Sequence, residues 1–120
     1  MELRILAVED EKGMRTLYSR LFPAGRYSLT LAENVAEATR LMDSGIYDLL
    51  ISDLLLPDGT GLELIRRFRE QGPGRSILVT GSMPQEALAD LGKKEGLLRI
   101  YGKPFDIGDL LRVVETLAAV

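Results

Sequence analysis

Residues 3–11 read LRILAVEDE, a nearly continuous apolar run that leads directly into three acids. A short apolar run of this kind is typical of a strand that is buried on both faces of a parallel sheet. Acids directly after such a strand stand at the carboxyl edge of the sheet, where open parallel sheets bind their ligands. This stretch therefore indicates both the fold class and the place of a functional site.

The rest of the chain alternates between short apolar runs and helical stripes of apolar residues. Further strands are predicted at residues 27–32, 47–52, 76–79 and 97–101. Helices are predicted between them, capped at Asn34 and Asp106 in two cases, with a weak helix over residues 84–91. This alternation implies parallel βαβ units. We expect residues 1–120 to form one α/β domain, a doubly wound five-stranded parallel sheet with helices on both faces.

Composition excludes several classes of protein. Lys and Arg number 15 and Asp and Glu number 18, and this net charge of −3 gives no electrostatic footprint for nucleic acid. The absence of Cys and His rules out disulfides, thiolate metal sites, imidazole ligands and histidine phosphocarriers. No signal peptide and no apolar run of the ~20 residues needed to span a membrane is present. We expect a cytoplasmic protein without membrane or direct nucleic-acid contacts.

Four of the five predicted strands deliver polar side chains to the same edge of the predicted sheet. Glu9 and Asp10 follow the first strand, Asp53 the third, Thr80 the fourth and Lys103 the fifth. Three converging carboxylates repel one another, and a bound divalent cation would neutralise this repulsion. Because all the ligands are oxygens, a hard cation such as Mg²⁺ is favoured.

This set of residues suits phosphoryl transfer. A carboxylate such as Asp53 can attack phosphorus and form an aspartyl phosphate. A metal ion and the Lys103 ammonium would neutralise the charge on the transferred group. The Thr80 hydroxyl can donate a hydrogen bond to a phosphoryl oxygen. We therefore predict that Asp53, Thr80 and Lys103 take part in the chemistry.

Four motifs, each after its own strand, resemble the receiver domain of two-component response regulators over essentially the whole chain. They are VEDE at residues 8–11, DLLLPDGTG at residues 53–61, Thr80-Gly81 and Lys103-Pro104-Phe105. Any one of them is a weak signal, but all four in this order make a strong one. The resemblance implies the flavodoxin-like strand order 2-1-3-4-5.

The resemblance also implies roles for individual residues. Asp53 matches the phosphoacceptor and a metal ligand, and Asp10 matches the direct metal ligand. Glu9 matches the acid that acts on the metal through a water, and the backbone carbonyl of Leu55 matches the third protein ligand to Mg²⁺. Lys103, like Thr80, matches a phosphate contact, and its bond to the following proline is usually cis in the family.

The partners implied by the resemblance belong to a signalling pathway. The phosphoryl donor is a phosphohistidine on a sensor histidine kinase or a phosphotransfer protein. The receiver catalyses only its own phosphorylation and dephosphorylation, so it is not an enzyme acting on another substrate. The face made by the fourth helix, the fifth strand and the fifth helix would then contact a downstream protein, a fused output domain or a second copy of the chain.

Some positions depart from the family pattern. The family's switch aromatic usually stands three residues before the lysine, where this chain has Ile100, and Tyr101 stands only two before it. Either Tyr101 faces away from the switch position, because neighbouring strand residues face opposite ways, or the loop is shifted by one residue. Leu55 and Ser82 occupy positions that influence phosphoryl lifetime in the family, and an apolar Leu55 predicts a long-lived phosphoryl state.

Other interpretations stay open. A flavodoxin-like electron carrier would need a phosphate cradle after the first strand, where this chain has acids. A degenerate receiver would act as an interaction module without phosphorylation. A hydrolase with an Asp nucleophile after the first strand usually has a second Asp two residues later, and this chain has Lys12 there. More simply, Asp53 could be a strand-end turn residue, Glu11 an acid favoured at a helix N-terminus, and Gly61 a product of turn geometry.

Overall fold

The computed structural model describes residues 2–81 and 83–118, so Ser82 lies outside the described residues. The strands are β1 (Leu3–Val8), β2 (Tyr27–Ala32), β3 (Leu49–Asp53), β4 (Leu55–Leu56), β5 (Gly59–Thr60), β6 (Arg75–Thr80) and β7 (Arg99–Gly102). The helices are α1 (Lys12–Leu21), α2 (Val35–Ser44), α3 (Gly61–Gln71), α4 (Gln85–Glu95) and α5 (Ile107–Ala118).

The main sheet has five parallel strands in the order β2-β1-β3-β6-β7. Numbered within this sheet alone, the order is 2-1-3-4-5, so the predicted doubly wound topology is confirmed. The order reverses between β1 and β3, which places the carboxyl ends of these two strands side by side. A ligand crevice is expected at such a reversal.

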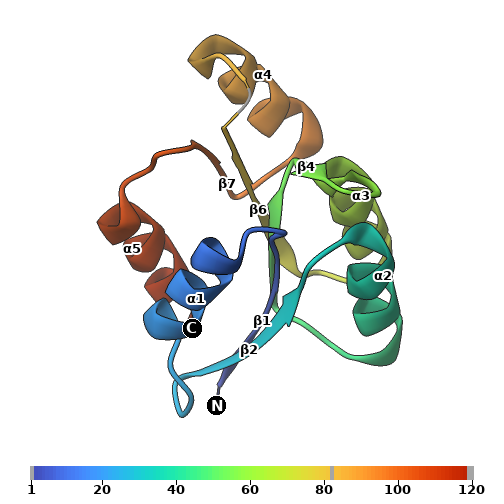
Figure 1. Cartoon of the computed structure of the whole chain (residues 1–120), viewed down its shortest axis with the longest axis vertical. Helices are drawn as coiled ribbons and strands as arrows, with labels where there is room; N and C mark the ends of the chain where they lie inside the picture. The colour runs from blue at the N-terminus through green and yellow to red at the C-terminus, as the bar shows by residue number, and fades with distance from the viewer. Residues whose placement is uncertain (1, 82, 119–120) are drawn as a thin grey trace.

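Helices cover both faces of the sheet, as predicted (Figure 1). One core joins the sheet to α1 and α5, and its fully buried members include Ile5, Tyr18, Ile51, Ile77, Leu110 and Val114. The second core joins the opposite face to α2 and α3, and it includes Leu6, Ala38, Leu50, Leu64, Ile65 and Leu78. Alternate residues of β1, β3 and β6 therefore serve opposite cores, which explains their almost unbroken apolar sequences.

Helix boundaries largely follow the predicted caps. The Asn34 side chain accepts a hydrogen bond of 2.8 Å from the Glu37 amide, and the Asp106 side chain accepts one of 3.3 Å from the Asp109 amide. α4 is longer than predicted, because it continues through Gly92 and ends only at Gly96. Gly96 takes the left-handed conformation (φ 66°) that favours glycine after a helix.

Three strand predictions need correction in their bounds, because the third main strand covers residues 49–53 instead of 47–52 and the fourth covers residues 75–80 instead of 76–79. The last main strand covers residues 99–102 instead of 97–101, because the Leu97 amide bonds the Gly92 carbonyl and still belongs to the end of α4. The segment between β3 and α3, where no strand was predicted, contains the small antiparallel hairpin β4–β5. Asp58 at its turn accepts hydrogen bonds from the Val35 and Ala36 amides (2.7 and 3.0 Å), which fastens the hairpin to the start of α2.

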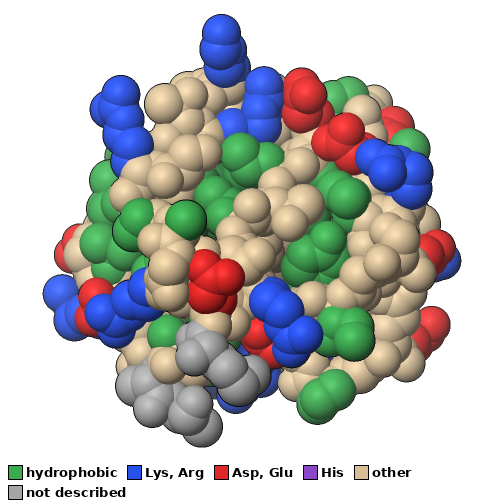
Figure 2. Space-filling model, turned by 90° about the horizontal axis from the view of Figure 1, so that it is seen from below, with side chains coloured by type: hydrophobic (Ala, Val, Ile, Leu, Met, Phe, Trp, Pro, Cys, Tyr) green, Lys and Arg blue, Asp and Glu red, His purple; other side chains and the backbone are tan. Residues whose placement is uncertain are grey.

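The end of the molecule at which the strands begin is seen in Figure 2. Hydrophobic side chains reach the surface in several places across the middle of this face, and basic and acidic side chains are interspersed around them. No single-sign patch of the kind that binds nucleic acid is visible on this face. Among the described residues, no helix is both long and apolar enough to cross a membrane.

Candidate functional site

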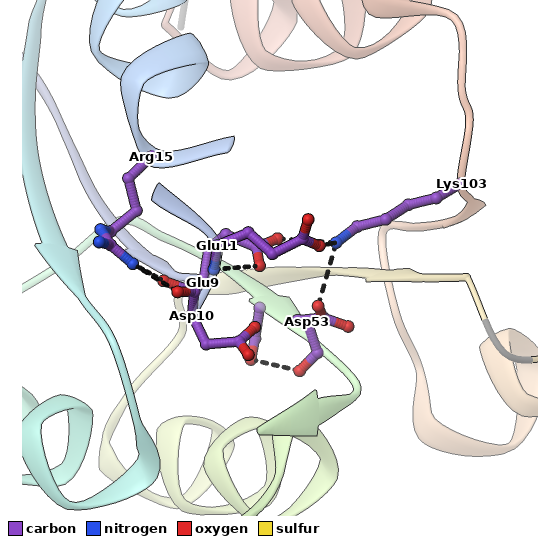
Figure 3. Close-up of polar contacts among 7 residues, drawn as sticks. Glu9, Asp10, Glu11, Arg15, Asp53 and Lys103 are labelled. Carbon is purple, nitrogen blue, oxygen red and sulfur yellow. Dashed lines mark hydrogen bonds and ion pairs between the residues drawn. The ribbon is translucent and has the colours of Figure 1, made fainter. Parts of the chain in front are cut away.

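The three acids that the sequence assigned to the site meet at the carboxyl edge of the sheet (Figure 3). Asp53 is the last residue of β3, and Glu9 and Asp10 directly follow β1, the neighbouring strand. One carboxylate oxygen from each of the three residues lies within 4.8 Å of the other two. Asp10 is exposed, whereas the Asp53 side chain is only 11% exposed. The acids thus form one cluster with an open side toward solvent.

Lys103 closes the other side of this cluster. Its Nζ lies 2.8 Å from Glu9 Oε1 and 3.0 Å from Asp53 Oδ2. A third carboxylate, that of Glu11, has an oxygen 3.3 Å away. The Lys103–Pro104 peptide bond is cis, as the resemblance implied. The predicted convergence of the lysine on the acids is therefore present in the structure.

Glu9 is the most buried member of the cluster, with no exposed surface. Burial raises the pKa of the Glu9 carboxyl above its usual value, and the Lys103 ammonium and the Glu11 amide oppose this only in part. Burial alone would lower the pKa of Lys103, but hydrogen bonds to Glu9 and Asp53 outweigh it and raise this pKa. The ammonium is thus held in its charged form between two carboxylates.

The remaining predicted site residues, Thr80 and Leu55, are each joined to a member of this cluster through the backbone. Thr80 is buried at the end of β6, and its carbonyl accepts a 2.8 Å hydrogen bond from the Lys103 amide. Leu55 lies two residues after Asp53 at the start of β4. Leu55 is 56% exposed, and because its side chain has no ligand atom, only its backbone carbonyl could bind a metal ion.

Gly61 has a stronger reason to be glycine than the turn geometry that the sequence suggested. A Cβ at this position would lie 2.2 Å from the backbone oxygen of Asp53 and 2.8 Å from the Ser52 Oγ. The Ser52 hydroxyl itself donates a 2.9 Å hydrogen bond to the Asp53 carbonyl. The first residue of α3 therefore packs directly against the backbone that carries Asp53, and only glycine leaves room for this contact.

Sequence reasoning missed the roles of Glu11 and Arg15. Glu11 is the N-cap residue of α1, but its side chain makes no cap hydrogen bond and contacts Lys103 instead. The Arg15 guanidinium donates hydrogen bonds to the backbone carbonyls of Glu9 (3.0 Å) and Asp10 (2.8 Å). Helical spacing was the available signal, because Arg15 lies one turn after Glu11 on the helix that starts beside the acids.

The two candidates for the switch position face opposite sides of the sheet. Ile100 packs on the core that contains α2 and α3, and Tyr101 packs on the core that contains α1 and α5. The Tyr101 hydroxyl donates a 2.8 Å hydrogen bond to Asp109 of α5. The pairing of β7 with β6 is regular through both residues, which favours a Tyr101 that faces away over a shifted loop.

A five-stranded doubly wound sheet with an acid cluster and a lysine at its reversal point defines a class of small α/β domains that can handle phosphate and a metal ion. The sequence profile described as the response regulator receiver domain matches residues 5–115. The chain belongs to this family of two-component signalling domains, and receiver domains are not enzymes in the usual sense.

Relatives and solved structures agree with this assignment. The chain is similar to the DNA-binding transcriptional regulator NtrC of Azospirillum brasilense, with 29% identity over 92% of this chain and 23% of that protein. It is 31% identical to the transcriptional regulatory protein DltR of Streptococcus agalactiae over 91% of this chain and 49% of that protein. The chain thus spans a quarter to a half of the length of these relatives.

Among solved structures, the signal receiver domain of an HD domain-containing protein from Pseudomonas fluorescens Pf-5 is similar, with a TM-score of 0.84 and 27% identity. That similarity covers 97% of this chain and 94% of the other. The HemR receiver domain from Leptospira biflexa has the same TM-score and identity over 99% of this chain and 96% of the other.

Proposed function

We propose that this domain, residues 1–120, is a phosphoacceptor switch that takes a phosphoryl group on Asp53 in the presence of Mg²⁺. One observation carries the proposal: carboxylate oxygens of Glu9, Asp10 and Asp53 cluster within 4.8 Å, with the Lys103 ammonium 3.0 Å from Asp53. A degenerate receiver would lack one of these groups. All of them are present here, on the elements that the family pattern assigns to them.

The acid cluster fits a hard divalent cation. Mg²⁺ holds its oxygens at ~2.1 Å, so two oxygens on the same ion lie at most ~4.2 Å apart. A spread of up to 4.8 Å is compatible with Asp10 and Asp53 as direct ligands and Glu9 acting through a water. The backbone carbonyl of Leu55 is proposed as the third protein ligand. When bound, the ion would supply positive charge that neutralises the oxygens of the transferred group.

The proposed chemistry assigns one step to each of Asp53, Lys103 and Thr80. The Asp53 carboxylate attacks phosphorus in line, and the bond from phosphorus to the imidazole nitrogen of a phosphohistidine donor breaks as the new bond forms. The Lys103 ammonium, which contacts Asp53 at 3.0 Å, shifts to a phosphoryl oxygen. The Thr80 hydroxyl donates a second hydrogen bond to the phosphoryl group. Movement of Thr80 would then bias the loop between β6 and α4.

The partners are proposed to be those of a cytoplasmic signalling pathway. A sensor histidine kinase or phosphotransfer protein would supply the phosphoryl group. The α4–β7–α5 face would change on phosphorylation and contact a downstream protein, a fused output domain or a second copy of the chain.

Intact mass spectrometry after incubation with acetyl phosphate and Mg²⁺ tests the proposal. Wild type is expected to gain one phosphoryl group, and chelation of the metal is expected to stop the reaction. Asp53→Asn should gain none, because an amide cannot form the acyl phosphate. Asp90→Asn, which changes an exposed acid of α4, should react at the wild-type rate. Wild-type phosphorylation of the Asp53→Asn variant would overturn the assignment.

The same phosphorylated sample tests the output face. Hydrogen exchange of α4, β7 and α5 is expected to change on phosphorylation, while exchange in α2 stays unchanged. Sedimentation of the two forms then separates a dimer from a monomer that awaits another partner.

A further inference from the structure

The Arg15 side chain holds the backbone of the two metal-site acids that follow β1. Its Nη1 donates to the carbonyl oxygens of Glu9 (3.0 Å) and Asp10 (2.8 Å). Its Nη2 lies 3.4 Å from the carboxylate of Glu33, in the loop between β2 and α2. The side chain is only 19% exposed, so these contacts hold it in a largely buried place.

The segment is also held from other directions. The Glu9 amide donates to the Ala32 carbonyl (2.9 Å), and the Glu11 amide donates to Glu9 Oε2 (3.1 Å). Arg15 binds the carbonyl oxygens of the Glu9–Asp10 and Asp10–Glu11 peptide units, and the second of these units also carries the Glu11 amide (Figure 3). The Glu9 and Asp10 carboxylates then point toward Asp53 and away from Arg15. Arg15 thus contacts only the backbone of these acids.

We propose that Arg15 is a positioning residue for the metal site, which fixes the turn at Glu9 and Asp10 so that both carboxylates meet Asp53 before the ion arrives. The inference rests on the proposed function, since it concerns the same ion. Ordering a backbone segment in advance removes an entropic penalty from the binding step. Loss of the Arg15 contacts is therefore expected to weaken metal binding although the ligands themselves remain.

An electrostatic role and a positioning role of Arg15 predict opposite changes in metal affinity when the residue is removed. Arg15 is a cation beside the site, so its removal would by charge alone strengthen the binding of another cation. If Arg15 acts by position, its removal weakens binding despite the loss of a positive charge. The direction of the change in metal affinity therefore distinguishes the two roles.

Calorimetric titration of the metal-free protein with Mg²⁺, supported by electron paramagnetic resonance with Mn²⁺, measures this affinity directly. Arg15→Ala is expected to raise the Kd about tenfold, the effect of one backbone segment losing its order. Hydrogen exchange at Glu11 should become faster in the metal-free variant, because the turn that its amide closes loosens. Arg67→Ala is the matched control, since it removes an arginine of α3 that pairs with Asp43.

Arg15→Lys separates position from charge further. It keeps the charge but loses the planar fork, so its Kd should lie between those of wild type and Arg15→Ala. If Arg15→Ala does not fold, Arg15→Lys alone tests the inference. An unchanged or lower Kd in these variants would overturn the positioning role and leave the proposed function intact. Failure of the wild type to bind either ion would remove the metal site itself, and the inference with it.

Discussion

At the scale of single residues, the site is built from charges that oppose one another. Lys103 lies within 3.3 Å of three carboxylates, one of which belongs to the fully buried Glu9. Burial of a carboxylate is unfavourable unless it is paired, so Lys103 stabilises the cluster when no metal is bound. The same ammonium repels an incoming cation. Lys103 would thus compete with the proposed metal ion for the acids, whereas Arg15 binds only the backbone of Glu9 and Asp10.

Substitution Lys103→Met tests this competition. Removal of the ammonium is expected to lower the Kd for Mg²⁺ by about tenfold, because one repelling charge leaves the neighbourhood of the ion. The rate of phosphoryl uptake from acetyl phosphate should fall at the same time, since the phosphate loses a cationic contact. Calorimetry and intact mass spectrometry measure the two quantities. Lys103→Arg keeps the charge and should bind Mg²⁺ nearly as wild type does; tighter binding by this control would argue against a charge effect.

At the scale of elements, the sequence predicted the strands and the helix cap near the site better than the contacts between distant segments that hold the site in place. β1 and β2 have the predicted bounds, and the Asn34 cap is present, because these depend on local apolar runs and local hydrogen bonds. The contact of Gly61 with Asp53 and the cap that Asp58 provides to α2 were not predicted. Both join segments that only the finished fold brings together, so no local pattern reveals them.

The end of α4 shows the same limit. The sequence predicted this helix only to residue 91, whereas in the structure it continues to Glu95, which binds it to α3. The Glu95 carboxylate, only 6% exposed, accepts a fork of hydrogen bonds from Arg66 (3.0 and 3.2 Å), and Arg69 donates to its backbone carbonyl. These partners come from a different helix, which explains why helical periodicity alone ended α4 too early.

The Glu95 contact predicts a pH-dependent stability. The Arg66 hydrogen bonds hold the pKa of the Glu95 carboxyl below its ordinary 4.5. A carboxyl whose pKa is lower in the folded state stabilises the protein above its unfolded pKa, and this stability is lost as the pH falls through the folded pKa. Wild type should therefore melt at a higher temperature than Glu95→Gln at pH 7, and the two curves should converge below about pH 4. A difference in melting temperature that is constant with pH would contradict this.

At the scale of the whole molecule, repulsion within the acid cluster destabilises a fold that its two apolar cores stabilise. The carboxylates of Asp10 and Asp53 come from different strands and meet only when the sheet is formed. Their repulsion in the metal-free protein lowers the free energy of unfolding, whereas an ion that binds them only in the folded state raises it. The stability of the entire domain should therefore depend on Mg²⁺, although the ion would touch only one edge of the sheet.

Thermal unfolding with and without Mg²⁺ measures this linkage. At a free Mg²⁺ concentration about a hundred times the Kd, the free energy of unfolding of wild type is expected to rise by about 2.7 kcal/mol. Asp10→Asn should lose most of this gain, because the exposed Asp10 is proposed as a direct ligand of the ion. Without metal, however, the same variant should be at least as stable as wild type, since one of three clustered charges has gone. Sodium chloride at equal ionic strength is the control for a general salt effect. An equal gain in the free energy of unfolding of both proteins would show that Mg²⁺ does not stabilise the domain through the acid cluster.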